Sequence, residues 1–85
     1  MAKRILYIED DTDIGRWVQE DLTKRGYAVR WLTSGDGAAD HAEEADLIVL
    51  DVMLPGLDGF TVGQRLKKAV PHTPILMLSA RTAVD

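Results

Sequence analysis

Residues 46–60 read DLIVLDVMLPGLDGF and contain the clearest structural pattern in the chain. The apolar run at 47–50 is too short for a helix, and it stops abruptly at Asp51. Pro55 and Gly56 then interrupt the segment, as is typical of a loop. The pattern predicts a buried strand that ends in a single aspartate, followed by a turn-rich loop.

Three further strands are predicted on either side of this segment. Residues 5–8 (ILYI) and 75–78 (ILML) are short continuous apolar runs, as expected of strands buried in a parallel sheet. Residues 27–31 instead alternate between bulky apolar side chains and Ala or Arg, which indicates a strand at the edge of the sheet with one wetter face.

Three helical segments separate these strands. The residues expected to pack on the sheet are Ile14, Trp17, Val18 and Leu22 in the first, Ala38, Ala42 and Ala45 in a short second helix over 36–45, and Phe60, Gly63, Leu66 and Val70 in the third. Expected boundaries are Asp11 or Thr12 and Gly26 for the first helix, and Asp58 and Pro71 for the third. Alternating strands and helices predict right-handed crossovers and an α/β fold, with a largely parallel sheet covered on both faces.

Polar residues follow three of the predicted strands: Glu9 and Asp10 the first, Asp51 the third and Ser79 the fourth. Because the carboxyl ends of parallel strands meet at one edge, we expect these side chains to lie together, where such folds bind ligands. Clustered carboxylates need a cation, and an all-oxygen site suits Mg²⁺. An aspartate beside such an ion can attack phosphorus, which predicts an aspartyl phosphate.

Composition excludes several other classes. With 10 Lys plus Arg against 14 Asp plus Glu, the net charge of -4 is unlike that of a nucleic-acid-binding domain. The absence of cysteine excludes disulfides and thiolate metal sites. No long apolar segment or signal-peptide cleavage site is visible, so we expect no membrane contact and a cytoplasmic location.

Several of the polar residues also have a simpler structural interpretation. Asp11, Thr12 and Asp13 are interpreted as helix-capping residues, and capping alone is an open reading for Glu9 and Asp10 on local pattern. Ser79 by itself would suit a turn or a cap. The histidines, His41 and His72, are expected to face solvent rather than bind a ligand, as are Lys67 and Lys68. Trp17 and Trp31 are expected in or near the core.

The segments RILYIEDD (4–11), DLIVLDVMLPGLDGF (46–60) and PILMLSAR (74–81) resemble the receiver domains of bacterial two-component response regulators. The LPGLDG run most resembles those of the winged-helix transcription-factor subfamily. The resemblance implies a flavodoxin-like (CheY-like) parallel sheet with strand order 2-1-3-4-5. It implies a domain that is phosphorylated by a sensor histidine kinase or a small phosphodonor, catalyses that transfer itself and is not a classical enzyme.

Individual roles follow from the same resemblance. Asp51 matches the phosphoacceptor, Glu9 and Asp10 the acid pair that holds Mg²⁺, and Met53 the residue whose backbone carbonyl completes the metal shell. Ser79 matches the switch hydroxyl that hydrogen-bonds the phosphoryl oxygen. Ala80 matches the small residue beside it, while Pro55 and Gly56 match the loop next to the acceptor.

The resemblance covers about two thirds of a receiver. Residues 1–85 are therefore expected to form a partial receiver domain with strands one to four of five, without strand five and its active-site lysine, and without an output domain through which the parent would bind DNA. Because strand four would then have an unpaired edge, we expect homo-oligomers through edge pairing or exchange of elements. The alternative function is a non-phosphorylatable fragment that acts only as a folding or self-association module.

Two other classes of protein fit the sequence less well. Aspartate-nucleophile phosphatases usually carry a second Asp two positions after the nucleophile, where this chain has Met53. Nucleotide- or flavin-binding domains of the same architecture have a glycine-rich loop after the first strand, whereas this chain has EDDTD at 9–13, whose acids would repel a phosphate.

Overall fold

The computed structural model of the protein describes residues 2–51 and 59–78. Strands and helices alternate along the described chain, as predicted. Their bounds are β1 Arg4–Ile8, α1 Thr12–Lys24, β2 Ala28–Leu32, α2 Ala38–Ala42, β3 Leu47–Asp51, α3 Gly59–Ala69 and β4 Ile75–Leu78. None of these helices has the length and apolar character needed to cross a membrane.

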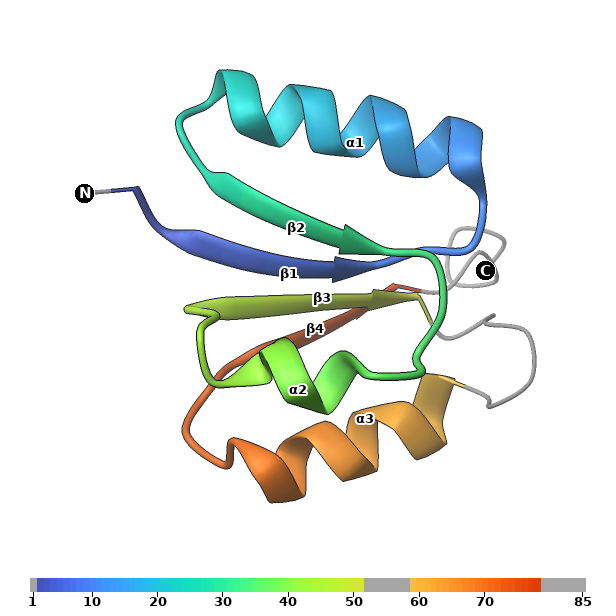
Figure 1. The fold of residues 1–85 in the computed structure, drawn as a ribbon, viewed down its shortest axis with the longest axis vertical. Coiled ribbons are helices and arrows are strands. Elements are labelled where there is room, and N and C mark those ends of the chain that lie inside the picture. The colour runs from blue at the N-terminus through green and yellow to red at the C-terminus, as the bar shows by residue number, and fades with distance from the viewer. Residues whose placement is uncertain (1, 52–58, 79–85) are drawn as a thin grey trace, which may run out of the picture.

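The four strands form one parallel sheet in the order β2-β1-β3-β4, which confirms the predicted flavodoxin-like topology (Figure 1). β1 is an inner strand, paired with β2 on one side and with β3 on the other. In this register Ile8 lies beside Leu50. The next residues along the two strands, Glu9 and Asp51, therefore leave the sheet next to each other.

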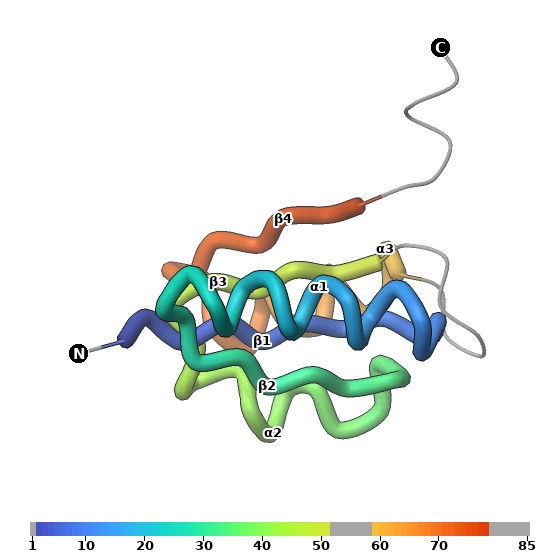
Figure 2. Tube along the Cα trace, turned by 90° about the horizontal axis from the view of Figure 1, so that it is seen from above, coloured from blue at the N-terminus to red at the C-terminus, as the bar shows by residue number. Residues whose placement is uncertain are grey.

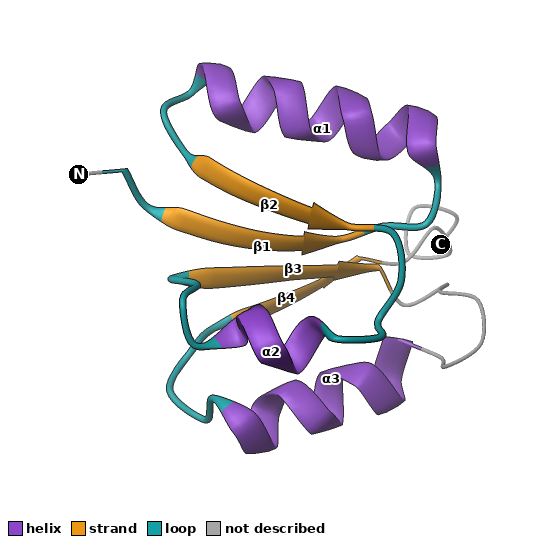
Figure 3. Cartoon of the chain, in the orientation of Figure 1, coloured by secondary structure: helices purple, strands orange, loops and turns teal. Residues whose placement is uncertain are grey.

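Helices cover both faces of the sheet, with α1 on one side and α2 and α3 on the other (Figure 3). The face toward α2 and α3 carries the larger core, in which Leu6, Ile48 and Leu66 are almost fully buried. The face toward α1 carries a smaller core around Tyr7 and Val49, against which other apolar residues pack partly buried: Val18, Leu22, Val29, Trp31 and Leu47.

Some helix residues that were expected to pack on the sheet are exposed instead. In α1, Val18 and Leu22 pack on the sheet as expected, but Ile14 and Trp17 are 51% and 69% exposed. The residue of α1 that lies deepest is Gly15, which contacts the ring of Trp31, so the buried face is centred on this glycine and turned away from Trp17. Phe60, at the start of α3, is likewise exposed at 62%, whereas Val62, Gly63 and Leu66 face the core.

The second helix is shorter than the predicted range of 36–45. α2 begins at Ala38 because Gly37 before it has φ 77°, a left-handed conformation that cannot continue a helix. After Ala42 the chain closes with a tighter turn, in which the N–H of Ala45 donates to the carbonyl oxygen of Ala42. Ala38 and Ala42 are buried as predicted, and Ala45 is partly buried.

β4 is the least covered strand. It pairs only with β3 among the described strands, and Figure 2 shows that α1 lies over the middle of the sheet rather than over β4. Leu76, Met77 and Leu78 are 52%, 40% and 40% exposed. This end of the described sheet therefore presents an apolar strand to its surroundings.

Candidate functional site

Two neighbouring strands deliver acidic side chains to the same edge of the sheet. β1 ends at Ile8, so Glu9 and Asp10 are the first residues beyond it, and Asp51 is the last residue of β3. α1 begins just after Glu9 and Asp10, and Asp11 is its N-cap. The side chain of Asp11 accepts hydrogen bonds from the N–H groups of Asp13 (2.9 Å) and Ile14 (3.0 Å). The local sequence thus separates one capping acid from three acids that converge.

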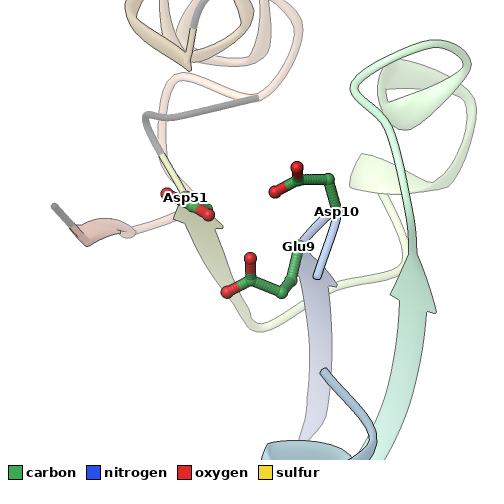
Figure 4. A group of neighbouring side chains, drawn as sticks. All are labelled: Glu9, Asp10 and Asp51. Carbon is green, nitrogen blue, oxygen red and sulfur yellow. The ribbon is translucent and has the colours of Figure 1, made fainter. Parts of the chain in front are cut away.

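Glu9, Asp10 and Asp51 point toward one another from the ends of β1 and β3 (Figure 4). One carboxylate oxygen from each residue lies within 4.8 Å of the other two. Within residues 2–51 and 59–78, this is the only group of three or more ligand-type side chains with such spacing. Glu9 is buried, Asp51 half-buried and Asp10 exposed, so the cluster is open to solvent on one side.

Glu9 is held more firmly than an acid of a surface cluster would be. Its side chain is 6% exposed. The hydroxyl of Tyr7 donates to Oε1 (3.2 Å), and the N–H of Asp11 donates to Oε2 (3.3 Å). Its main chain is anchored to β2, because its N–H donates to the carbonyl oxygen of Leu32 at 3.0 Å.

The cluster shifts the protonation of its buried members. Burial, together with a hydrogen bond shared with Asp51, raises the pKa of Glu9 to about 7. Burial, followed by the nearby charge of Glu9, also raises the pKa of the Tyr7 hydroxyl. Without a cation, Glu9 therefore keeps its proton through most of the acidic range, which relieves the repulsion among three carboxylates.

The donor set fits a hard divalent cation. Mg²⁺ prefers oxygen ligands and usually keeps several of its waters, which suits a group of carboxylate oxygens that is open to solvent on one side. Glu9, Asp10 and Asp51 can hold such an ion.

Trp31 is a contributor that the sequence pattern did not reveal. Its Nε1–H donates to the main-chain carbonyl oxygen of Glu9 at 2.9 Å, and its ring lies against Gly15 of α1. The sequence pattern likewise presents Tyr7 only as part of an apolar run. Alternation along a strand puts Tyr7 and Glu9 on one face, and this pattern could have predicted their contact.

Several predicted positions are not part of the described site. Ser79, Met53, Ala80, Pro55, Gly56 and the expected N-cap Asp58 lie outside the described residues. His72 and the helix lysines Lys67 and Lys68 are exposed, as predicted, and His41 is half-buried. A surface hollow lies along β2, with Gln19, Arg30 and Glu44 in its lining, and it shares no residue with the acidic cluster.

Comparison with known proteins shows which family the sequence resembles. Residues 5–85 match the response regulator receiver domain family. Two curated relatives are an uncharacterized transcriptional regulatory protein of Bacillus subtilis, YbdJ (42% identical over 82 residues), and the transcriptional activator protein IrlR of Burkholderia pseudomallei (46% over 83). These matches include 96% and 95% of the chain but only 37% and 36% of the relatives, so the chain spans little more than a third of their length.

Solved structures agree with the fold. A receiver domain protein from Methanospirillum hungatei is 26% identical with a TM-score of 0.86, over 93% of this chain and 65% of that one. The response regulator TrrA of Thermotoga maritima, solved in complex with Mg²⁺ and BeF, is 29% identical with the same TM-score, over 95% of this chain and 72% of that one.

Proposed function

Because this chain belongs to the response regulator receiver domain family, we propose that it accepts a phosphoryl group on Asp51 in a reaction that depends on Mg²⁺. The observation that carries the proposal is the convergence of three carboxylate oxygens within 4.8 Å at the carboxyl ends of β1 and β3. That edge is where ligands bind in open parallel sheets.

The three acids have different environments and therefore different proposed roles. Asp51 is the half-buried member at a strand end, and its carboxylate oxygen is proposed to attack phosphorus. The new bond joins that oxygen to phosphorus while the bond from phosphorus to the donor's imidazole nitrogen breaks, and the imidazole leaves with the electron pair. Glu9 and Asp10 would hold the ion together with Asp51. Bound Mg²⁺ would offset the negative charge of the transferring phosphoryl oxygens.

The remaining roles rest on the family resemblance. Met53 would supply a backbone carbonyl to the metal, and Ser79 would hydrogen-bond the phosphoryl group. Both lie outside the described residues. The proposed donor is a phosphohistidine of a sensor kinase. The domain would catalyse its own phosphorylation, without turnover of a separate substrate.

We also propose that the chain is one part of a longer protein. Residues 1–85 would form the first part of a receiver domain in a longer transcriptional regulator, with the DNA-binding output elsewhere in the parent. Support comes from the relatives, which are transcriptional regulators and are matched over little more than a third of their length.

The test is the intact mass of the 85-residue chain after incubation with Mg²⁺ and a small phosphodonor. We expect one phosphoryl adduct that hydroxylamine removes. Asp51→Asn should abolish the adduct, as should removal of Mg²⁺, whereas Asp13→Asn, which changes an acid outside the cluster, should retain it. A folded chain that gives no adduct, or an adduct that survives in Asp51→Asn, would contradict the proposal.

A second candidate function is self-association, and the exposed β4 strand favours it. Leu76 and Leu78 are exposed. They alternate along β4 with Met77, which lies against Gly63 of α3, so they face the opposite side of the sheet. β4 pairs with β3 alone among the described strands. An uncovered edge of this kind can pair with a second copy. Sedimentation should then show a mass that rises with concentration, and Leu76→Lys should lower it. A mass equal to one chain at every concentration would rule this out.

A further inference from the structure

We propose that Tyr7 is a positioning residue for the metal site, one whose hydroxyl fixes the Glu9 carboxylate in the orientation in which it takes Mg²⁺. The inference rests on the proposed metal-dependent function. It adds to that function a residue that does not itself reach the ion or the phosphoryl group.

Tyr7 reaches Glu9 because the two residues are two positions apart along a strand. Side chains at such positions lie on the same face of a sheet, here the face toward α1. Tyr7 is completely buried and Glu9 is 6% exposed, so their contact is shielded from water. The hydroxyl of Tyr7 donates to Oε1 of Glu9 at 3.2 Å.

This contact completes a set of donors around one carboxylate. Oε2 of Glu9 accepts from the N–H of Asp11 at 3.3 Å, so both carboxylate oxygens accept hydrogen bonds from outside the acidic cluster. An ionised carboxylate oxygen can accept more than one partner, which leaves both oxygens able to bind a cation. The two donors come from different directions, the interior of the sheet and the start of α1, and together they restrict rotation of the carboxyl group.

Packing accounts for the aromatic ring of Tyr7 but not for its hydroxyl group. The ring already fills the core beside Ile5 and Val49, and phenylalanine would fill it equally. A buried hydroxyl is costly unless it is hydrogen-bonded, so packing alone does not account for tyrosine at this position.

Tyr7→Phe tests the inference, with Tyr27→Phe as the matched control. The chain has two tyrosines, and Tyr27 is 39% exposed between α1 and β2. We expect the Mg²⁺ dissociation constant, measured by calorimetric titration, to rise about tenfold in Tyr7→Phe, the range seen when a partner of a metal ligand is removed. Tyr27→Phe should bind as tightly as the unchanged chain.

A second measurement uses the unchanged sequence and therefore does not depend on how Tyr7→Phe folds. With ¹³C at the ζ-carbon of tyrosine, the chain gives two signals, and we expect Mg²⁺ to shift that of Tyr7 and not that of Tyr27. Equal Mg²⁺ affinity in the Tyr7→Phe variant, or a Tyr7 signal that does not move while the unchanged chain binds Mg²⁺, overturns the inference and leaves the proposed function standing. An unchanged chain that takes up no Mg²⁺ overturns both.

Discussion

Trp31 donates a hydrogen bond of 2.9 Å from its indole Nε1 to the main-chain carbonyl oxygen of Glu9. The edge strand β2 thereby holds the end of β1, from which the acidic cluster projects. The same indole ring lies against Gly15, the most buried residue of α1. One side chain therefore joins the edge strand, the first helix and the candidate metal site.

Gly15→Ala should destabilise the fold. A β-carbon at Gly15 would overlap Cζ2 and Cε2 of Trp31, and the indole cannot move away without breaking its bond to Glu9. Overpacking of this kind costs about 1–3 kcal/mol. Urea unfolding followed by circular dichroism would measure the loss.

The background Trp31→Val supplies the control for that substitution. With the ring removed, Gly15→Ala should become neutral or stabilising, because alanine favours a helix interior over glycine by about 1 kcal/mol. Equal destabilisation in both backgrounds would show that contact with Trp31 is not the cause.

The stability of the metal-free chain should fall as pH rises from about 4.5 toward 7. Burial raises the folded-state pKa of Glu9 from 4.5 to about 7, so within this window the folded chain binds more protons than the unfolded chain. The contribution of Glu9 to the free energy of unfolding is complete below pH 4.5 and is lost as pH rises to about 7. The loss should be on the order of 2 kcal/mol, measured by urea unfolding in the presence of EDTA.

Glu9→Gln isolates this contribution, because the amide keeps a similar shape and does not ionise. The variant should lack the part of the pH profile between 4.5 and 7. Saturating Mg²⁺ should reverse the trend in the unchanged chain, since metal binding requires ionised Glu9 and stabilises the folded state. Parallel profiles for the two proteins in EDTA would be evidence against a raised pKa at Glu9.

Leu66→Ala and Leu76→Ala should lower the free energy of unfolding by very different amounts, although both substitutions remove the same atoms. Leu66 is 1% exposed in the core between α3 and the sheet, and its truncation should cost about 3 kcal/mol. Leu76 is 52% exposed on β4, and its truncation should cost less than about 1 kcal/mol. The urea midpoints of the two variants would measure this difference in the free energy of unfolding. If Leu76→Ala lost as much stability as Leu66→Ala, β4 would be covered in solution, as self-association requires.

Asp11→Ala should shorten or fray the start of α1. Its side chain accepts from the N–H groups of Asp13 and Ile14, and loss of such a cap costs about 1 kcal/mol. Asp13→Ala removes an acid from the same turn without removing the cap and should cost less. If thermal unfolding ranks the two variants in the opposite order, charge at the helix start matters more than capping.

The parallel arrangement of the strands and the three acids of the candidate site were predictable from local sequence pattern, whereas the order of the strands followed from the family resemblance. Short apolar runs at 5–8 and 47–50 end directly in Glu9 and Asp51, and both patterns depend on neighbours along the chain. The capping role of Asp11 was predictable for the same reason, since a cap is a contact across three residues.

The exposed positions of Ile14, Trp17 and Phe60 were not predictable. Helical spacing shows which apolar residues could share a face, but the helix turns whichever side packs best toward the sheet. In α1 that side is centred on Gly15, because a residue without a side chain admits the ring of Trp31. The length of α2 likewise depends on Gly37 and its left-handed conformation, which composition alone does not reveal.

The sequence by itself determined which acids reach the edge of the sheet, because strand ends and helix starts are encoded by residues close together in the chain. Only the tertiary structure decided how those acids are held: Tyr7 beneath Glu9, Trp31 from the neighbouring strand, and a buried glutamate whose pKa rises to about 7. Burial and hydrogen bonds between separate elements set these properties, and they exist only once the sheet and helices have packed together.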